Sequence, residues 1–198
     1  MTRRWLAVWL APVLLAAPAL GQRLVSRGQS IAVAESMLTV MPASDWSRLQ
    51  ARPGRHAERW TLDGAGLNAL TFYGGIKRGM ALFREVDRHF SPLPRFSASM
   101  LPTDVAQFYE SSYRVAGGSP LFAIDEITPA RFAGRPGFRF AYHFLREKDG
   151  VNRRGEATGA VIDQQLYLIT FEAPAIHYFE RDLAEYRALV ATARIAGG

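Results

Sequence analysis

The second half of the chain alternates apolar and polar residues in short runs that predict consecutive β-strands. Turn-forming residues separate these runs, as is typical of an antiparallel meander. The four strands are expected at residues 121–127, 137–146, 154–162 and 166–171.

The first half of the chain has weaker patterns of the same kind. Residues 42–59 show no regular alternation and are expected to be irregular, with Trp46 and Leu49 resting on the domain. Gly74 and Gly75 are expected to end a strand. Strands are predicted at residues 37–41, from 60 to a turn at Asp63-Gly64, at 67–73 and, as an edge segment, at 80–86.

The pair of runs at 137–146 and 154–162 is the most informative. Asp149-Gly150 between them is typical of a tight hairpin, which pairs position 144 with 155 across a two-residue turn, or with 157 across a four-residue loop. Both registers have the same parity, so each places the same residues on one face. Large rings then cover a strand of small residues, which predicts a core layer. The rings are Phe138, Phe140, Tyr142 and Phe144, and the opposing residues are Gly155, Ala157, Gly159 and Val161.

Two segments have helical spacing. The first follows Pro102, with Thr103 as the expected N-cap and Asp104 in the first turn, and it stops at Gly117-Gly118. The second is expected at 175–193, with Pro174 near its first position, and should pack on the aromatic sheet face. Its apolar stripe is Ile176, Phe179, Leu183, Tyr186 and Val190. This order of elements predicts an α+β domain, an antiparallel sheet with packed helices.

The first 21 residues have the pattern of a secretory signal peptide. Arg3 and Arg4 precede an apolar run at 5–20, and small residues allow cleavage after Gly21 or, alternatively, after Ala19. The run contains two prolines and is shorter than the about 20 residues that a bilayer-spanning helix needs. We therefore expect a signal peptide at 1–21, a polar lead at 22–36, and a single domain at 37–198. The mature protein is predicted to be periplasmic, without a transmembrane segment.

Composition narrows the chemistry. The chain has no cysteine, which excludes disulfides, a thiolate nucleophile and cysteine metal sites. The net charge is +6, and lysine occurs only at positions 77 and 148, so arginine supplies nearly all of the basic charge. Arginine binds phosphate and carboxylate bidentately, although a GC-rich genome would also favour it. Export argues against a nucleic-acid partner and leaves anionic lipid headgroups or envelope glycans as targets.

Three segments resemble uncharacterised exported proteins of alphaproteobacteria: Trp-Thr-Leu-Asp-Gly at 60–64, Leu-Thr-Phe-Tyr-Gly-Gly at 70–75, and Thr-Phe-Glu-Ala-Pro-Ala-Ile-His-Tyr-Phe at 170–179. From about residue 36 to 195, the order of helix, four-strand meander and closing helix also resembles the PsbP/Mog1-like α/β/α sandwich. The nearer resemblance implies no activity. The remote one implies assembly or accessory factors, or binding of a small GTPase, and a fold analogy alone transfers neither role.

No motif for catalysis or metal binding is present. The sequence lacks Gly-x-Ser-x-Gly and Ser-x-x-Lys, and its four histidines lack metal-ligand spacing, so we assign no catalytic residue, metal or cofactor. The Gly-Gly-Ile-Lys-Arg-Gly segment at 74–79 lacks the Lys-Ser/Thr and following helix of a phosphate-binding loop and is expected to be a wide turn. An acid/base pair assembled from distant positions remains open.

Two surfaces are candidates for binding. The sheet face opposite the aromatic rings is mixed in polarity, and the hairpin tip is basic and expected not to serve the core. Each could equally be a solvated surface. The candidate binding residues are Arg139, His143, Arg146, Lys148, Arg153, Arg154 and Glu156.

These observations favour a non-catalytic binding or accessory protein of the bacterial cell envelope, whose partner is an envelope protein or an anionic envelope component. An envelope enzyme of hydrolase type would instead show a deep pocket where titratable groups converge. A constitutive subunit of an envelope complex would leave a large apolar surface bare.

Overall fold

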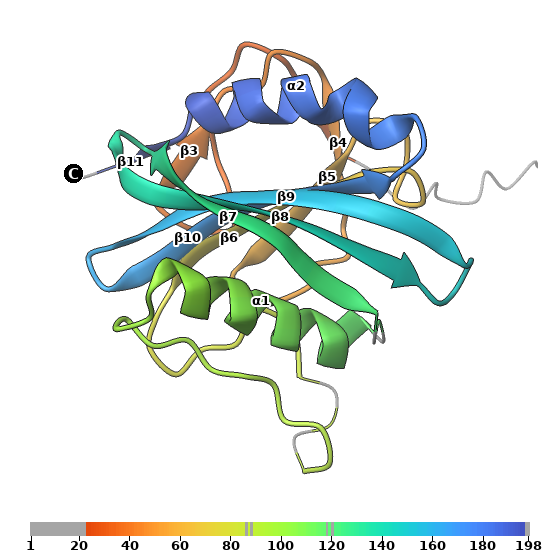
Figure 1. Cartoon of the computed structure of the whole chain (residues 1–198). Coiled ribbons are helices and arrows are strands. Elements are labelled where there is room, and N and C mark those ends of the chain that lie inside the picture. Colours follow the sequence, from red (N-terminus) through yellow and green to blue (C-terminus); the bar gives the residue numbers. More distant parts are fainter. Residues whose placement is uncertain (1–22, 86, 88, 118, 120, 197–198) are drawn as a thin grey trace, which may run out of the picture.

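A long antiparallel sheet with one helix on each face forms the body of the protein, seen in a computed structural model that describes residues 23–85, 87, 89–117, 119 and 121–196 (Figure 1). The predicted signal peptide lies outside these residues. Helix α1 (Pro102–Gly117) covers one face of the sheet and α2 (Tyr178–Ala191) covers the other. In spatial order the eight strands are β1 (Arg23–Val25), β4 (Trp46–Arg48), β5 (Ala57–Thr61), β6 (Ala69–Ile76), β10 (Gln165–Pro174), β9 (Val151–Ile162), β8 (Arg135–Arg146) and β7 (Phe122–Phe132).

A small second sheet lies on the α2 side. Its order is β11-β3-β2, with β11 at Arg194–Ile195, β3 at Leu38–Val40 and β2 at Ile31–Ala32. The architecture confirms the predicted α+β class. Among the described residues, no helix is long and apolar enough to cross a membrane.

The predicted aromatic layer is confirmed, although both predicted registers are wrong. Residues 147–150 form the loop, because Arg146 pairs with Val151, and Phe144 therefore pairs with Arg153. The observed register has the same parity as the two expected ones, so the same side chains share a face. Phe140 lies opposite Ala157 and Tyr142 opposite Gly155.

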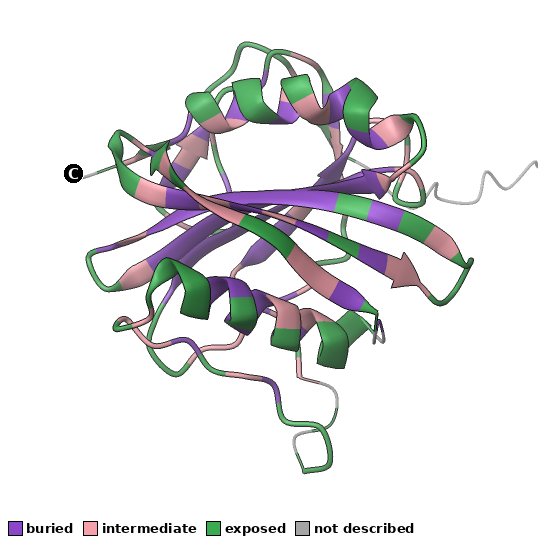
Figure 2. Cartoon of the chain, in the orientation of Figure 1, coloured by how far each residue is buried: buried purple, intermediate pink, exposed green. Residues whose placement is uncertain are grey.

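Helix α2 sits on the face opposite to the one expected. The aromatic layer packs against α1, whose Val105, Phe108 and Tyr109 are buried in the same cluster. Helix α2 packs on the other face, where Tyr186 lies 5.7 Å from Phe171, centroid to centroid. The prediction that α2 covers the aromatic rings is wrong, because the chain that follows β10 continues on the other face of the sheet. Figure 2 shows the resulting buried positions along the sheet and on the helix sides that face it.

Both helices begin differently from the prediction. Asp104 Oδ2 accepts the Leu101 N–H at 2.9 Å, so Leu101 lies at the cap position and Thr103 lies inside the first turn. Helix α2 starts only at Tyr178, because β10 runs through Pro174 and the Ala175 N–H still donates to the Asn152 carbonyl at 2.9 Å. Ile176 is consequently outside the apolar stripe and is 87% exposed.

The N-terminal half is more ordered than its pattern indicates. Residues 23–36, expected as a polar lead, contribute β1 to the main sheet and β2 to the small one. Strands β4 and β5 lie largely within the segment expected to be irregular, whereas 80–85 form no strand. Gly74 does not end β6. A Cβ there would lie 2.2 Å from Ser36 Oγ, so glycine at this position allows β6 to lie in close contact with the segment that carries Ser36.

Candidate functional site

The polar sheet face, one of the two candidate binding surfaces, is largely occupied by α2. Glu156 is 4% exposed and accepts hydrogen bonds from Arg187 Nε at 3.0 Å and Nη2 at 2.6 Å. Arg154 pairs with Glu180 and stacks over the Phe179 ring at 4.7 Å. What stays open is a cavity of about 140 Å³ beside Arg139. These residues mainly join α2 to the sheet.

His143 lies on the same strand but outside the helix contact. Its Nδ1 is 2.6 Å from Asp125 Oδ1, where β7 bulges between Ile124 and Glu126. Both side chains are exposed, and within the described chain neither contacts a nucleophile. An exposed pair of this kind contributes little to stability, and it assembles no catalytic triad.

Most of the basic hairpin tip is committed to internal contacts. Arg146 pairs with Asp149, and this hydrogen bond holds the pKa of Asp149 below its usual value. Arg153 is 1% exposed and donates from Nη1 to the Gly66 carbonyl at 3.0 Å and from Nη2 to the Leu67 carbonyl at 3.2 Å. The expectation that the tip residues do not serve the core is therefore wrong for Arg153. Lys148 alone of the four keeps a side chain without a described partner.

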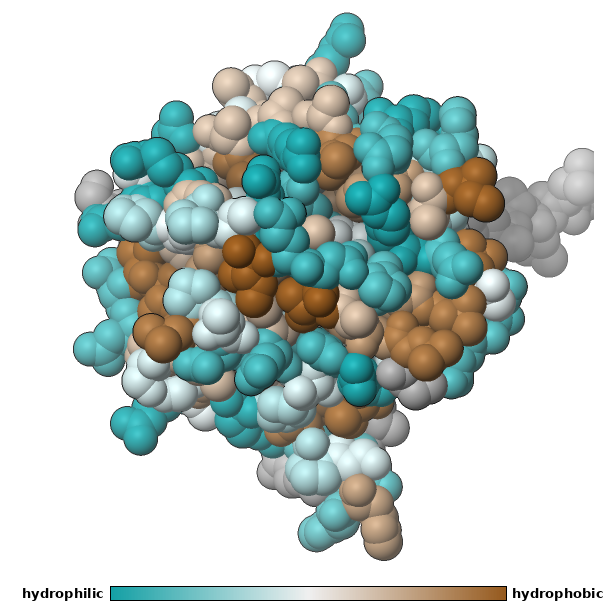
Figure 3. Space-filling view, in the orientation of Figure 1, coloured by the Kyte–Doolittle hydropathy of each residue, from teal (hydrophilic) through white to brown (hydrophobic). Residues whose placement is uncertain are grey.

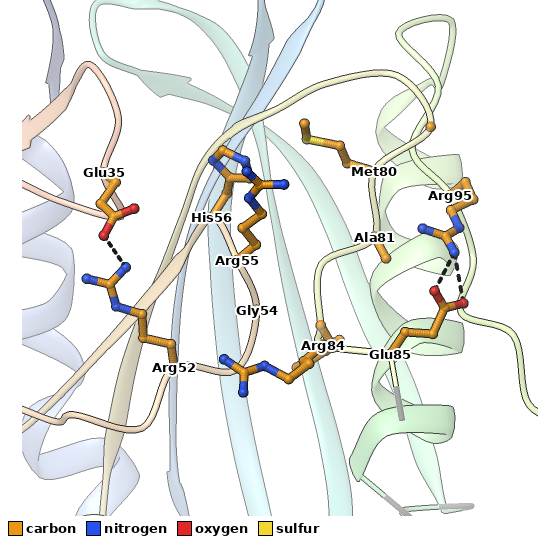
Figure 4. Close-up of a pocket in the computed structure, with 12 residues that line it drawn as sticks. Glu35, Arg52, Gly54, Arg55, His56, Met80, Ala81, Arg84, Glu85 and Arg95 are labelled. Atoms are coloured by element: carbon orange, nitrogen blue, oxygen red, sulfur yellow. Dashed lines mark hydrogen bonds and ion pairs between the residues drawn. The ribbon is translucent and has the colours of Figure 1, made fainter. Parts of the chain in front are cut away.

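A different basic site lies beside the start of β5. Two loops, at 52–56 and 79–85, enclose a pocket of about 640 Å³ on the α1 side of the sheet. Figure 4 shows the Arg55 guanidinium near His56, the Arg52–Glu35 pair on one side, the Arg95–Glu85 pair on the other, and the Arg84 guanidinium apart from that of Arg55. The charged lining residues are Glu35, Arg52, Arg55, Arg84, Glu85 and Arg95.

Backbone hydrogen bonds hold the walls of this pocket together. The Arg84 N–H donates to the Pro53 carbonyl at 2.7 Å. The two loops approach so closely that a Cβ at Gly54 would lie 2.0 Å from the Leu82 carbonyl oxygen, so only glycine fits at this position. On the other side, the Phe96 N–H donates to the Met80 carbonyl at 2.9 Å. The pocket is therefore largely preformed, as ligand sites commonly are.

Two of its arginines are already neutralised. Arg52 pairs with Glu35, and their hydrogen bond lowers the pKa of Glu35. Glu35 lies in a turn in which Ala34 and Glu35 adopt φ values of 53° and 50°. Buried Glu58 stabilises this turn by accepting the Ala34 N–H at 3.0 Å. Arg95 binds the two oxygens of Glu85 at 2.8 and 2.7 Å.

The other two arginines are not paired in this way. No hydrogen bond or ion pair to the side chain of Arg55 or Arg84 exists within the described chain. Four arginines and two glutamates leave an excess of positive charge in the pocket. Guanidinium groups in this state are suited to a planar carboxylate or a phosphate.

The inner wall of the pocket is apolar and rigid. Phe83 lines it and packs edge-on against Tyr73 and Tyr113, with ring centroids 5.9 and 5.8 Å apart. Behind Phe83, the Tyr113 hydroxyl donates to Glu172 Oε2 at 3.1 Å, and burial raises the pKa of Tyr113. Within the described residues, no group of three or more His, Cys, Asp or Glu could hold a metal ion.

Sequence reasoning missed this pocket because its residues come from segments without periodicity. The signals in the sequence are the basic run Arg52-Pro-Gly-Arg-His56 and the Gly-Gly-Ile-Lys-Arg-Gly segment at 74–79. The expected wide turn at 74–79 starts later than predicted, because β6 continues through Ile76 and the turn lies at 78–79, where Gly79 lines the pocket.

Comparison with known proteins identifies the fold. No protein-family model and no curated protein sequence matches the chain. The chain is similar to the solution structure of cyanobacterial PsbP (CyanoP) from Synechocystis sp. PCC 6803, with a TM-score of 0.53 and 13% identity over 93% of this chain and 99% of that one. This likeness confirms the predicted PsbP-like fold.

Two further structures are more distant. The Saccharomyces cerevisiae Ran-binding protein Mog1p has a TM-score of 0.49 and 9% identity, covering 89% of this chain and 96% of that chain. LpqN, involved in cell envelope biogenesis of Mycobacterium tuberculosis, has a TM-score of 0.36 and 11% identity, covering 93% and 89%. The resemblance to alphaproteobacterial exported proteins stays a prediction.

Proposed function

We propose that the protein is an exported, non-catalytic binding protein of the bacterial cell envelope that binds anionic groups in the pocket beside β5. One observation carries the proposal: Arg55 and Arg84, both without an acidic partner in the described chain, line one preformed pocket. A guanidinium that is not internally paired is free to bind phosphate or carboxylate through charge-assisted hydrogen bonds.

The competing enzyme hypothesis finds less support. His56, which lines the pocket, is the one histidine there, and the two carboxylates of the lining are each paired with an arginine. A general acid or base must be able to change its protonation near the working pH. The excess of arginine in the lining favours the binding of an anion over proton transfer.

The constitutive-subunit hypothesis requires a large bare apolar surface. The most exposed large apolar residues are instead dispersed among different elements, and Figure 3 shows apolar side chains in separate groups between polar ones on the face that it presents. They are Leu24, Met37, Met41, Phe90, Leu101, Val115, Leu121 and Ile176.

The envelope location rests on residues 1–21, which have the three-part pattern of a signal peptide. We expect the mature protein to begin at Gln22 or within two residues of it. N-terminal sequencing of periplasmic material measures this directly. An intact Met1 on membrane-bound protein would contradict export by cleavage.

Calorimetric titration with inorganic pyrophosphate tests the pocket. The double variant Arg55→Gln/Arg84→Gln should weaken binding at least about tenfold, since two charge-assisted contacts are lost. Arg135→Gln/Lys148→Gln is the matched control, because it removes two exposed charges outside the pocket. Equal binding by wild type and the pocket variant, or an equal loss in the control, would show that the pocket is not the site.

A further inference from the structure

The loop between Glu85 and Arg95 projects from the wall of the basic pocket, and its two ends are held together. Glu85 joins them by binding the Arg95 guanidinium and by accepting the Leu93 N–H at 3.4 Å. Glu85 and Arg95 also line the pocket. Figure 1 shows the described part of this loop, in yellow-green, projecting from the α1 side of the body.

The loop has an ordered apolar tip. Asp87 Oδ1 accepts the N–H groups of His89 and Phe90 at 3.1 and 3.0 Å, and the Ser91 N–H donates to the Asp87 carbonyl at 3.2 Å. These bonds form a turn that presents Phe90 outward. Phe90 is 88% exposed, the highest value among the exposed large apolar residues. Such an aromatic ring gains free energy wherever it leaves water.

Unpaired cations surround the base of this loop. Lys77 and Arg78 are exposed in the turn that leads to Gly79 on the pocket wall, and their side chains have no partner in the described chain. Arg55 and Arg84 lie inside the pocket. A small soluble anion would bind in the pocket and would make no contact with the protruding Phe90 ring. An apolar tip beside several cations matches an anionic lipid surface, which offers phosphates at the depth of the cations and acyl chains at the depth of the ring.

We infer that the pocket takes the phosphate headgroup of an anionic phospholipid at a membrane surface, with Phe90 inserted beside it. This inference rests on the proposed function and names its ligand. The phosphate oxygens accept hydrogen bonds from Arg55 and Arg84. Lys77 and Arg78 contact neighbouring headgroups, and the Phe90 ring enters the boundary with the acyl chains.

Co-sedimentation with vesicles tests this inference. Vesicles of phosphatidylglycerol and phosphatidylcholine should sediment the wild-type protein at low salt, and less of it at roughly 150 mM salt, where the charges are screened. Pure phosphatidylcholine vesicles should not. Phe90→Ser should lower the partition coefficient about tenfold, because the insertion of a large apolar side chain is lost. Ile176→Ser is the matched control, since Ile176 is 87% exposed on the α2 side and should have no effect.

The arginine variants connect the inference to the pocket. Each cation near an anionic surface contributes about fivefold, so Arg55→Gln/Arg84→Gln should lower the partition about 25-fold. Phe90→Ser should leave pyrophosphate binding unchanged.

Wild type that binds pyrophosphate but fails to sediment with the anionic vesicles at low salt would overturn the lipid inference and leave the anion pocket standing. Equal sedimentation of Phe90→Ser and wild type would also overturn it, because the attraction would then be adsorption by charge alone. Loss of both pyrophosphate and vesicle binding in the control Arg135→Gln/Lys148→Gln would overturn the pocket itself.

Discussion

Gly155 is a position where adding one methyl group should strongly destabilise the fold. A Cβ at Gly155 would lie 2.0 Å from Tyr142 Cζ, 2.3 Å from Cε2 and 2.5 Å from the hydroxyl oxygen. Tyr142 lies directly opposite in the β8–β9 ladder and is fully buried. In Gly155→Ala, the tyrosine ring must therefore move by more than an ångström, or the two strands must separate.

The surroundings of Tyr142 leave it no room to move. Its ring stacks on Phe122 with centroids 5.0 Å apart and contacts Tyr109 at 5.4 Å, and its hydroxyl is 3.2 Å from that of Tyr109. Overpacking a well-filled core costs about 1–3 kcal/mol, and more where neighbours cannot shift. Because the clash involves three ring atoms in the middle of an aromatic cluster, we expect Gly155→Ala to lower the free energy of unfolding by about 3 kcal/mol or more.

Urea unfolding followed by circular dichroism measures this loss. Gly66→Ala is the matched control, because its Cβ meets nothing within 4 Å, and it should be neutral or stabilising by up to about 1 kcal/mol. In a Tyr142→Ala background, which itself costs about 3–5 kcal/mol, Gly155→Ala should cost little, since the clashing ring is gone. A loss below about 0.5 kcal/mol for Gly155→Ala alone would refute the register and the packing described for this hairpin.

Three further predictions follow from the same packing. Phe140→Ala should cost about 3–5 kcal/mol in urea unfolding, because Phe140 is 1% exposed; a loss below about 1 kcal/mol would contradict the face assignment. Arg153→Gln should lower the free energy of unfolding by at least about 2 kcal/mol, since the charged donors to two loop carbonyls are lost. Arg154→Gln removes one partner of an exposed ion pair and should change it by no more than about 1 kcal/mol. Equal losses in the two variants would contradict this distinction. Burial raises the pKa values of Tyr73, Tyr109, Tyr142 and Tyr186 above the unfolded value of about 10, so their contribution to stability is fully present below pH ~10 and is lost as the pH rises beyond it. Their phenolate absorbance should appear together with unfolding, and gradual ionisation in the folded protein would contradict this prediction.

The sheet was predictable because strand patterns have a period of two. Phe138, Phe140, Tyr142 and Phe144 share a face in every register of the same parity, so the aromatic layer survived an error in the hairpin loop. The register itself depends on the loop, and Asp149-Gly150 was compatible with more than one loop length. Glu147 and Lys148 extend the turn to four residues. The ion pair between Arg146 and Asp149 stabilises this longer turn.

The side on which a helix packs was not predictable from its own residues. The apolar stripe of α2 indicates that the helix covers a sheet, and both faces of this sheet offered apolar positions. Phe171 and Ile169 on β10 alternate with Leu168 and Leu166, so the strand is apolar on both sides. The polar candidates Arg154 and Glu156 were therefore placed on an open surface, when they in fact bind Glu180 and Arg187 of the helix above them.

The role of an arginine in this protein is best judged from whether an acid is committed to it. Arg187 has Glu156, Arg181 has Asp63 and Asp182, and these pairs join α2 to the sheet and to the loop before β6. The pocket beside β5 differs, although acids are present there too. Glu35 and Glu85 each bind a different arginine at the edge of the pocket, which leaves Arg55 and Arg84 outside these ion pairs. An anion that binds the folded pocket and not the unfolded chain stabilises the fold, because it adds negative charge to a lining with an excess of arginine. At the hairpin tip, by contrast, Arg146 and Arg154 are each paired with an acid and Arg153 is buried against two carbonyls, so the pocket is the better place for an anion site.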